Sequence, residues 1–179
     1  VESASVGPWP TDLLILYNPD WSLLNTQQLT GICEWVSNGG RLLVVVGGHV
    51  MTPSNPLSEM LPFELGELQE TTPPASLMYQ WKFDGGPAEP VMARRIRPVK
   101  GARLYRLFGE EEGSGLYATA NAGFGAVGVL GVDPQQFNAS QRAHAAEFWV
   151  EIMKPLLEGK AGGTSSSGNS GAFISLQQE

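Results

Sequence analysis

Two apolar runs separated by an amphipathic stretch predict a strand, a helix and a second strand near the start of the chain. The run at Leu13–Tyr17 predicts a strand, because Asn18 and Pro19, which favour turns, follow it directly. The branched apolar run at Arg41–Val46 has no polar alternation, which is typical of a strand covered by helices on both faces. The order strand, helix, strand predicts a right-handed βαβ unit with parallel strands.

The segment between these strands has the apolar spacing of a helix. Apolar side chains recur three and four positions apart, at Leu29, Ile32, Cys33 and Val36. Asn25 and Gln28 resemble a capping box before them, and Gly39 supplies a C-terminal stop. Cys33 therefore lies in mid-helix on the apolar face, where a cysteine packs as a small hydrophobe and nothing activates its thiol.

From Leu77 to Val132 the pattern changes to short apolar runs separated by Gly and Pro clusters. We expect strands in the runs LMYQWKF, PVMARRIRPV, ARLYRLF, GLYATANA and AVGVLGV. The stretch SNPLSEMLPFEL before them predicts a short helix or turn that runs into a loop. A last helix is predicted from Ser140 to about Leu157, because one apolar stripe follows it and would dock on the sheet. The stripe consists of Ala145, Phe148, Trp149, Ile152, Met153 and Leu156.

These elements predict one α/β domain over residues 1–158, followed by a Gly/Ser-rich flexible linker or tail over residues 159–179. A chain of 179 residues is long enough to bury a real core. The sequence begins with Val1 and has no signal segment, so we expect it to be a piece of a longer chain. No apolar run approaches the roughly 20 residues that span a bilayer.

Charge and cysteine content narrow the classes of function. A net charge of −7 and a pI near 4.8 argue against nucleic-acid binding. The single cysteine excludes an internal disulfide and a multi-cysteine metal site. Six of the eleven basic residues lie on runs that are expected to form adjacent strands. We interpret this cluster first as the solvated face of a hairpin and second as a strip that attracts anions. The six residues are Arg94, Arg95, Arg97, Lys100, Arg103 and Arg106, and the acidic stretch GEEEG follows them.

The stretch NAGFGAVGVLGVD contains a formal G-x-G-x-x-G at Gly123, Gly125 and Gly128. In a dinucleotide site these glycines lie between a strand and the N-terminus of a helix, but here a strand-like run follows them. We therefore interpret Gly123 and Gly125 as turn residues of a hairpin, and Gly128 and Gly131 as close-packing or bulge positions. No NAD site and no other cofactor is expected.

Polar residues follow the predicted parallel strands, where open α/β sheets bind their ligands. The candidate ligand-binding residues are Asn18, Asp20, Gly47, Gly48, His49 and Asp133. Two carboxylates and an imidazole at one edge suffice for acid/base chemistry or for ligand binding. The alternative is structural: Asp133 precedes Pro134 and suits a turn or cap, and His49 suits a hydrogen-bonded loop residue. His144, with Glu147 and Glu151 in helical reach, suits a structural or solvated role.

Taken in order, DLLIL, LNTQQLTGICEWVSNGGRLLVVVGG, GFGAVGVLGVDP and AAEFWVEIMKPLL resemble the class I glutamine amidotransferase-like domains of bacterial envelope proteins, over about residues 10 to 158. The resemblance implies a flavodoxin-like three-layer α/β sandwich with a mostly parallel sheet, here with a β-rich hairpin section in the middle. Active members carry a Cys-His-Glu triad whose cysteine follows the strand matched by Arg41–Val46. In this sequence Gly47, Gly48 and His49 occupy that position. His144 does not form the H-x-E pattern of the active members, because Ala145, Ala146 and Glu147 follow it.

Without a thiolate there is no nucleophile for glutaminase chemistry. We therefore expect no catalytic residue, no cofactor and no metal, and a non-catalytic domain of a larger envelope protein that binds a ligand or another protein. Its expected partners are neighbouring domains of the parent or another envelope protein, without nucleic acid, and with a membrane only through segments outside this sequence. The alternative function is a hydrolase using His49 with Asp20 or Asp133. The expected location is extracytoplasmic, with the cytoplasm as the alternative.

Overall fold

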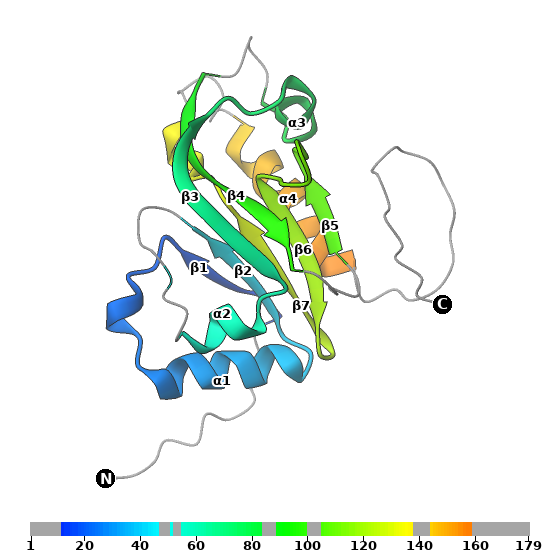
Figure 1. Ribbon diagram of the computed structural model, residues 1–179. Coiled ribbons are helices and arrows are strands. Elements are labelled where there is room, and N and C mark those ends of the chain that lie inside the picture. Colours follow the sequence, from blue (N-terminus) through cyan, green and yellow to red (C-terminus); the bar gives the residue numbers. More distant parts are fainter. Residues whose placement is uncertain are drawn as a thin grey trace, which may run out of the picture.

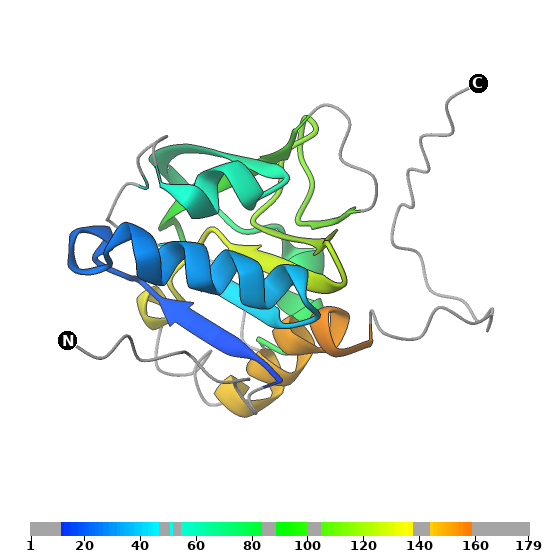
Figure 2. The ribbon, with the colours of Figure 1, turned by 90° about the horizontal axis from the view of Figure 1, so that it is seen from below.

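A five-stranded mixed sheet with helices on both faces forms the centre of the molecule (Figures 1 and 2). The structure is a computed structural model that describes residues 12–46, 51, 55–83, 89–99, 105–137 and 144–158. Within these ranges the main sheet has the order β1-β2-β7-β6-β5, and β3 and β4 form a two-stranded antiparallel sheet. The strands are β1 Leu14–Tyr17, β2 Arg41–Val45, β3 Phe63–Thr71, β4 Val91–Pro98, β5 Tyr105–Phe108, β6 Tyr117–Ala122 and β7 Gly125–Leu130.

The expected mostly parallel, flavodoxin-like sandwich is wrong. The β1–β2 and β2–β7 pairs are parallel, whereas β7–β6, β6–β5 and β3–β4 are antiparallel, so antiparallel pairs predominate among the described strands. The reason lies in the connections. A helix joins β1 to β2 and makes them parallel, but a tight turn joins β6 to β7 and forces these strands to run in opposite directions. The coarser prediction of an α/β domain is confirmed.

The predicted β1–helix–β2 unit is confirmed in its elements and its parallel pairing. Helix α1 spans Thr26–Ser37 and begins with the expected capping box. The Asn25 side chain accepts a hydrogen bond from the Gln28 backbone N–H at 2.8 Å, and the Gln28 side chain accepts one from the Asn25 N–H at 3.0 Å. Every residue of β2 is buried, as expected of a strand covered on both faces.

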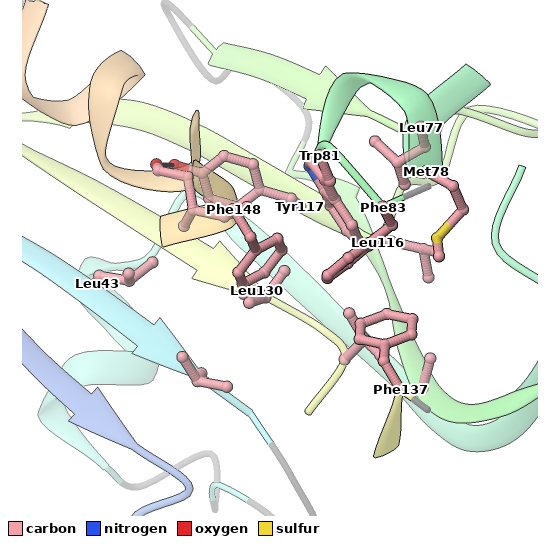
Figure 3. Close-up of a cluster of buried hydrophobic side chains, with 14 of the residues drawn as sticks. Leu43, Leu77, Met78, Trp81, Phe83, Leu116, Tyr117, Leu130, Phe137 and Phe148 are labelled. Atoms are coloured by element: carbon pink, nitrogen blue, oxygen red, sulfur yellow. Dashed lines mark hydrogen bonds between the residues drawn. The ribbon is translucent and has the colours of Figure 1, made fainter. Parts of the chain in front are cut away.

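Two hydrophobic clusters lie on opposite faces of the sheet, because successive strand residues point to opposite sides. Leu42 and Val44 of β2 pack in the cluster with α1, while Leu43 and Val45 pack in the cluster with helix α4, Ala145–Glu158. Figure 3 shows the second cluster, in which Phe148 of α4 lies among aromatic and aliphatic side chains. Among the described helices, none is long and apolar enough to cross a membrane.

Two elements differ from the sequence prediction. The first four residues of the run LMYQWKF lie in helix α3, Ala75–Gln80, and not in a strand; Leu77 and the C-cap residue Trp81 are both buried and lie four positions apart, about one helical turn. In SNPLSEMLPFEL the predicted short helix is confirmed as α2, Pro56–Met60, but strand β3 follows it where a loop was expected. Most of β3 is exposed, so it has no apolar alternation, and it owes its conformation to pairing with β4.

The predicted hairpin at the glycine-rich stretch is confirmed. Gly123 has a φ of +62°, which favours glycine, in the turn between β6 and β7. No helix follows β7 directly; Asp133 caps the short 3-10 helix η2, Pro134–Gln136. Gly131 is a close-packing position, since a Cβ there would lie 2.0 Å from the Arg94 carbonyl oxygen. The Arg94 N–H donates to the Gly131 carbonyl at 2.6 Å, which ties β4 to the main sheet.

The basic cluster is not a strip on adjacent strands. Strand β4 pairs with β3, whereas β5, which carries Arg106, belongs to the main sheet. Arg94 is buried and donates to the Gly66 carbonyl oxygen at 3.2 Å, and Arg95 pairs with Glu111 of the expected acidic stretch. Lys100 and Arg103, like the expected linker over residues 159–179, lie outside the described residues.

Candidate functional site

A tyrosine–aspartate pair joins the carboxyl ends of β1 and β7, two strands in the parallel part of the mixed sheet. Tyr17 is the last residue of β1, and its hydroxyl donates a hydrogen bond to Oδ1 of Asp133, which follows the end of β7. The same oxygen accepts the Gln135 backbone N–H at 2.9 Å, which caps η2. Strand β2 lies between β1 and β7, so the pair spans three strands at the edge where ligands are expected.

The Tyr17 hydroxyl stays protonated at neutral pH. Partial burial raises its pKa far above the ordinary value, and the hydrogen bond to Asp133 and the negative charge of that carboxylate act in the same direction. A tyrosine in this state donates its proton in a hydrogen bond and does not serve as a base or a nucleophile. The pair therefore holds the two strand ends together and presents a fixed polar edge.

Beside this pair lies a pocket of about 180 Å³ with a largely aromatic lining. The indole of Trp149 lies 6.2 Å from the Tyr17 ring, centroid to centroid, at an interplanar angle of 56°. The Phe148 ring packs 5.2 Å from the same indole in an edge-on arrangement. The lining residues are Tyr17, Phe83, Pro134, Gln135, Ala145, Phe148 and Trp149.

Asn18 and Asp133 lie at the expected edge, and Asp20 follows closely in sequence. Asn18 has a φ of +42°, and its N–H donates to the Val45 carbonyl at 2.9 Å. Its side-chain oxygen is enclosed and accepts no hydrogen bond. Asp20 caps the 3-10 helix η1, Trp21–Leu23, by accepting from the Ser22 N–H at 3.0 Å and the Ser22 hydroxyl at 2.7 Å. Both carboxylates thus have cap roles, as the structural alternative expected for Asp133.

The remaining candidates Gly47, Gly48 and His49 lie outside the described residues. Sequence reasoning missed Tyr17, Trp149 and Gln135. The sequence pattern placed Tyr17 in a strand and Trp149 on the apolar stripe of the last helix. The one signal for a site was that Tyr17 is the last strand residue before a turn, which puts it at the edge of the sheet. The contact between Tyr17 and Trp149 joins residues from opposite ends of the sequence, so no local pattern could predict it.

Cys33 has no catalytic setting. It lies within α1 and packs against the core cluster of that face, as predicted. Burial raises the pKa of the thiol, so the nucleophilic thiolate is disfavoured. His144 directly precedes α4 and is half-buried. In the part of the chain that the structure describes, no three His, Cys, Asp or Glu side chains gather into a group that could hold a metal ion.

The pocket beside the Tyr17–Asp133 pair can bind a flat apolar group and can offer it hydrogen bonds from polar side chains. Aromatic side chains supply most of the lining, and Tyr17 and Gln135 add polar groups to it. The carboxylate of Asp133 is already occupied by two donors.

Comparisons with known proteins identify a fold likeness only. A scan against family models finds no match, and a search of curated proteins finds none either. Among solved structures, the cytoplasmic protein STM1381 from Salmonella typhimurium LT2 matches with a TM-score of 0.53 and 16% identity, over 81% of this chain and 71% of that one. The cytoplasmic protein STM3548 from Salmonella typhimurium matches with a TM-score of 0.52 and 15% identity, over the same shares.

Proposed function

We propose that this chain is a non-catalytic binding domain and that the pocket beside the Tyr17–Asp133 pair takes a small planar aromatic molecule. The observation that carries the proposal is the aromatic lining of this pocket at the carboxyl edge of the parallel strands. A cavity of about 150 Å³ accommodates a benzene ring. The volume of about 180 Å³ here suits a single ring with a small polar substituent or a compact bicyclic ring.

The polar border gives the ligand an orientation. The Tyr17 hydroxyl donates to Asp133, so its oxygen lone pairs remain for a ligand O–H or N–H. Trp149 is half-buried and lines the pocket, so part of its side chain is accessible to a ligand. A phenol-like or indole-like ligand satisfies both features, because its ring stacks against aromatic faces while its single donor meets the tyrosine oxygen.

No described contact favours the hydrolase alternative. Asp20 and Asp133 each accept hydrogen bonds within their own 3-10 turns, and the proposed imidazole partner His49 lies outside the described residues. Burial raises the pKa of the Cys33 thiol, which fits the same conclusion. A binding role is therefore the simpler account of these side chains.

The setting of the domain is part of the proposal. Membership of the class I glutamine amidotransferase-like domains rests on the sequence motifs, and a larger parent protein with neighbouring domains as partners rests on the same resemblance. For the compartment, we favour the cytoplasmic alternative over the envelope, because both Salmonella structural relatives are named as cytoplasmic proteins.

The test uses 4-fluorophenol as the probe, followed by ¹⁹F NMR during titration with the full chain. Ala145 is exposed and lines the pocket, so Ala145→Phe places a ring inside it without disturbing the core. We expect saturable binding to the parent chain and an affinity at least tenfold lower for Ala145→Phe. Tyr17→Phe removes the oriented hydroxyl and is expected to weaken binding several-fold, about 1 kcal/mol.

The matched control is Ala146→Phe, because Ala146 is the next residue of α4, is also exposed and is not among the residues that line the pocket. It should bind the probe with the affinity of the parent chain. Equal losses in Ala145→Phe and Ala146→Phe, or no saturable binding to the parent chain, would refute the proposal.

A further inference from the structure

A second pocket, of about 250 Å³, lies at the opposite edge of the sheet, where β2 and β7 begin. Three of its residues form a row across neighbouring strands: Arg41 of β2 pairs with Ala126 of β7, which pairs in turn with Asn121 of β6. All three point to the α4 face, since Leu43 and Tyr117, an even number of residues away, pack in the cluster with α4. The row spans two strand spacings, about 10 Å between the outer Cα atoms.

Arg41 is only 9% exposed, and no acidic side chain in the described part of the chain forms an ion pair with it. Within the described ranges, no hydrogen bond or ion pair joins its guanidinium to another residue, although a buried cation is costly unless it is paired. The guanidinium nitrogens are not enclosed by protein atoms, so they are accessible to solvent. Because Arg41 lines the pocket, we infer that the guanidinium faces into that space. Glu158, at the end of α4, is exposed and makes no ion pair with it.

Small residues keep the space in front of Arg41 open. Ala126, between the two polar side chains, carries only a methyl group, and the glycines Gly39, Gly123 and Gly125 line the rim. Gly125 cannot be replaced by a larger residue, since a Cβ there would lie 2.1 Å from the Gly40 carbonyl oxygen. Phe124 and Leu156 supply an apolar wall, with Leu156 contributed by the last turns of α4.

We propose that this second pocket is an oxyanion site that binds the carboxylate of a small organic acid. The guanidinium presents parallel N–H donors that match a carboxylate in a two-pronged geometry, and the Asn121 amide supplies another donor across Ala126. One cation balances one negative charge, and the apolar wall covers a short hydrocarbon chain. The net charge of −7 opposes polyanions, so the ligand is a small monoanion and not a nucleic acid.

The experiment titrates the ¹⁵N-labelled chain carrying Ala145→Phe with potassium butyrate at constant ionic strength, so that the first pocket is blocked. Butyramide serves as the neutral probe of the same shape, and inorganic phosphate as the alternative anion. We expect saturable shifts of the Gly39, Gly123 and Gly125 amides and of the Asn121 side-chain amide with butyrate. Butyramide should bind at least tenfold more weakly, and phosphate should not saturate.

Two variants localise the binding. Arg41→Lys keeps the charge but loses the planar fork, and should weaken butyrate binding at least tenfold. Asn121→Ala changes an exposed residue, so the proposal can still be tested if the Arg41→Lys chain does not fold. This substitution should weaken butyrate binding several-fold. Arg97→Gln removes an exposed cation far along β4 and should leave binding unchanged.

The proposal is overturned if butyrate produces no saturable shifts, if butyramide binds equally well, if phosphate alone saturates, or if a folded Arg41→Lys chain binds butyrate as tightly as its parent. None of these results bears on 4-fluorophenol binding at the first pocket, so the two proposals fail separately.

Discussion

Single polar groups in this molecule have partners that lie far away in the sequence. The Tyr117 hydroxyl, in β6, donates to the Ile152 carbonyl oxygen of α4, and the Tyr17 hydroxyl donates to Asp133. Burial of Tyr117 raises the pKa of its hydroxyl far above the ordinary value. Arg41 contrasts with these tyrosines, because its buried side chain lines a pocket and its guanidinium has no partner among the described residues. Long-range pairs such as Tyr17–Asp133 form the candidate site, and no local sequence motif predicts them.

Stability should fall as the pH rises above about 10. The unfolded chain loses the Tyr117 proton near the ordinary pKa of about 10, whereas the folded chain keeps it, so above that pH the folded state binds more protons. The free energy of unfolding then decreases by up to about 1.4 kcal/mol per pH unit from this residue. Urea unfolding between pH 8 and 11.5 measures the slope, which should be shallower in Tyr117→Phe; equal slopes would contradict the assignment.

At the scale of elements, α1, β2 and the β6–β7 hairpin fit together through close backbone approach. Gly125, at the start of β7, faces the end of α1, where a Cβ would lie 2.2 Å from the Val36 carbonyl oxygen. Sequence patterns predicted α1 and β2 because each has an apolar face or run of its own. They failed for β3, whose exposed, glutamate-rich sequence becomes a strand only through pairing, and for α3, where an apolar run was interpreted as a strand.

Two glycine substitutions should have opposite effects on stability. Gly125→Ala forces a methyl group against two carbonyl oxygens and should cost about 3 kcal/mol or more. Gly31→Ala lies in the exposed interior of α1, where nothing approaches within 4 Å of the new Cβ, and should stabilise the chain by about 1 kcal/mol. Chemical denaturation of both variants measures the difference. A loss of stability in Gly31→Ala, or none in Gly125→Ala, would disprove this packing argument.

At the scale of the whole molecule, one sheet separates two hydrophobic clusters and α4 closes one of them. Phe148 is 1% exposed and contacts the rings of Trp81, Phe83 and Trp149, so it links α4 to the segment around α3 (Figure 3). The same helix contributes residues to both candidate pockets, at opposite ends of the sheet. The position of α4 therefore matters to the core and to each proposed binding site.

Phe148→Ala should lower the free energy of unfolding by about 3–5 kcal/mol, because it leaves a cavity at the centre of this cluster. Because both clusters share β2, we expect a single transition, with far-ultraviolet circular dichroism and tryptophan fluorescence changing together in denaturant. The matched exposed substitution Val150→Ala, on the same helix, should cost less than about 1 kcal/mol. A loss for Val150→Ala equal to that for Phe148→Ala, or two separate transitions, would contradict this account.

The sequence by itself determined the α/β class, the β1–α1–β2 unit, the hairpin at Gly123 and the helical, unreactive setting of Cys33, because each depends on neighbours within a few residues. Only the tertiary structure decided that the main sheet is mixed, with two parallel and two antiparallel pairs, that Tyr17 meets Asp133 and Trp149, and that Arg41 and Asn121 flank one small residue. Strand order and side-chain encounters across the sheet depend on which distant segments pair, and that choice is made by burial and hydrogen bonding summed over the whole molecule.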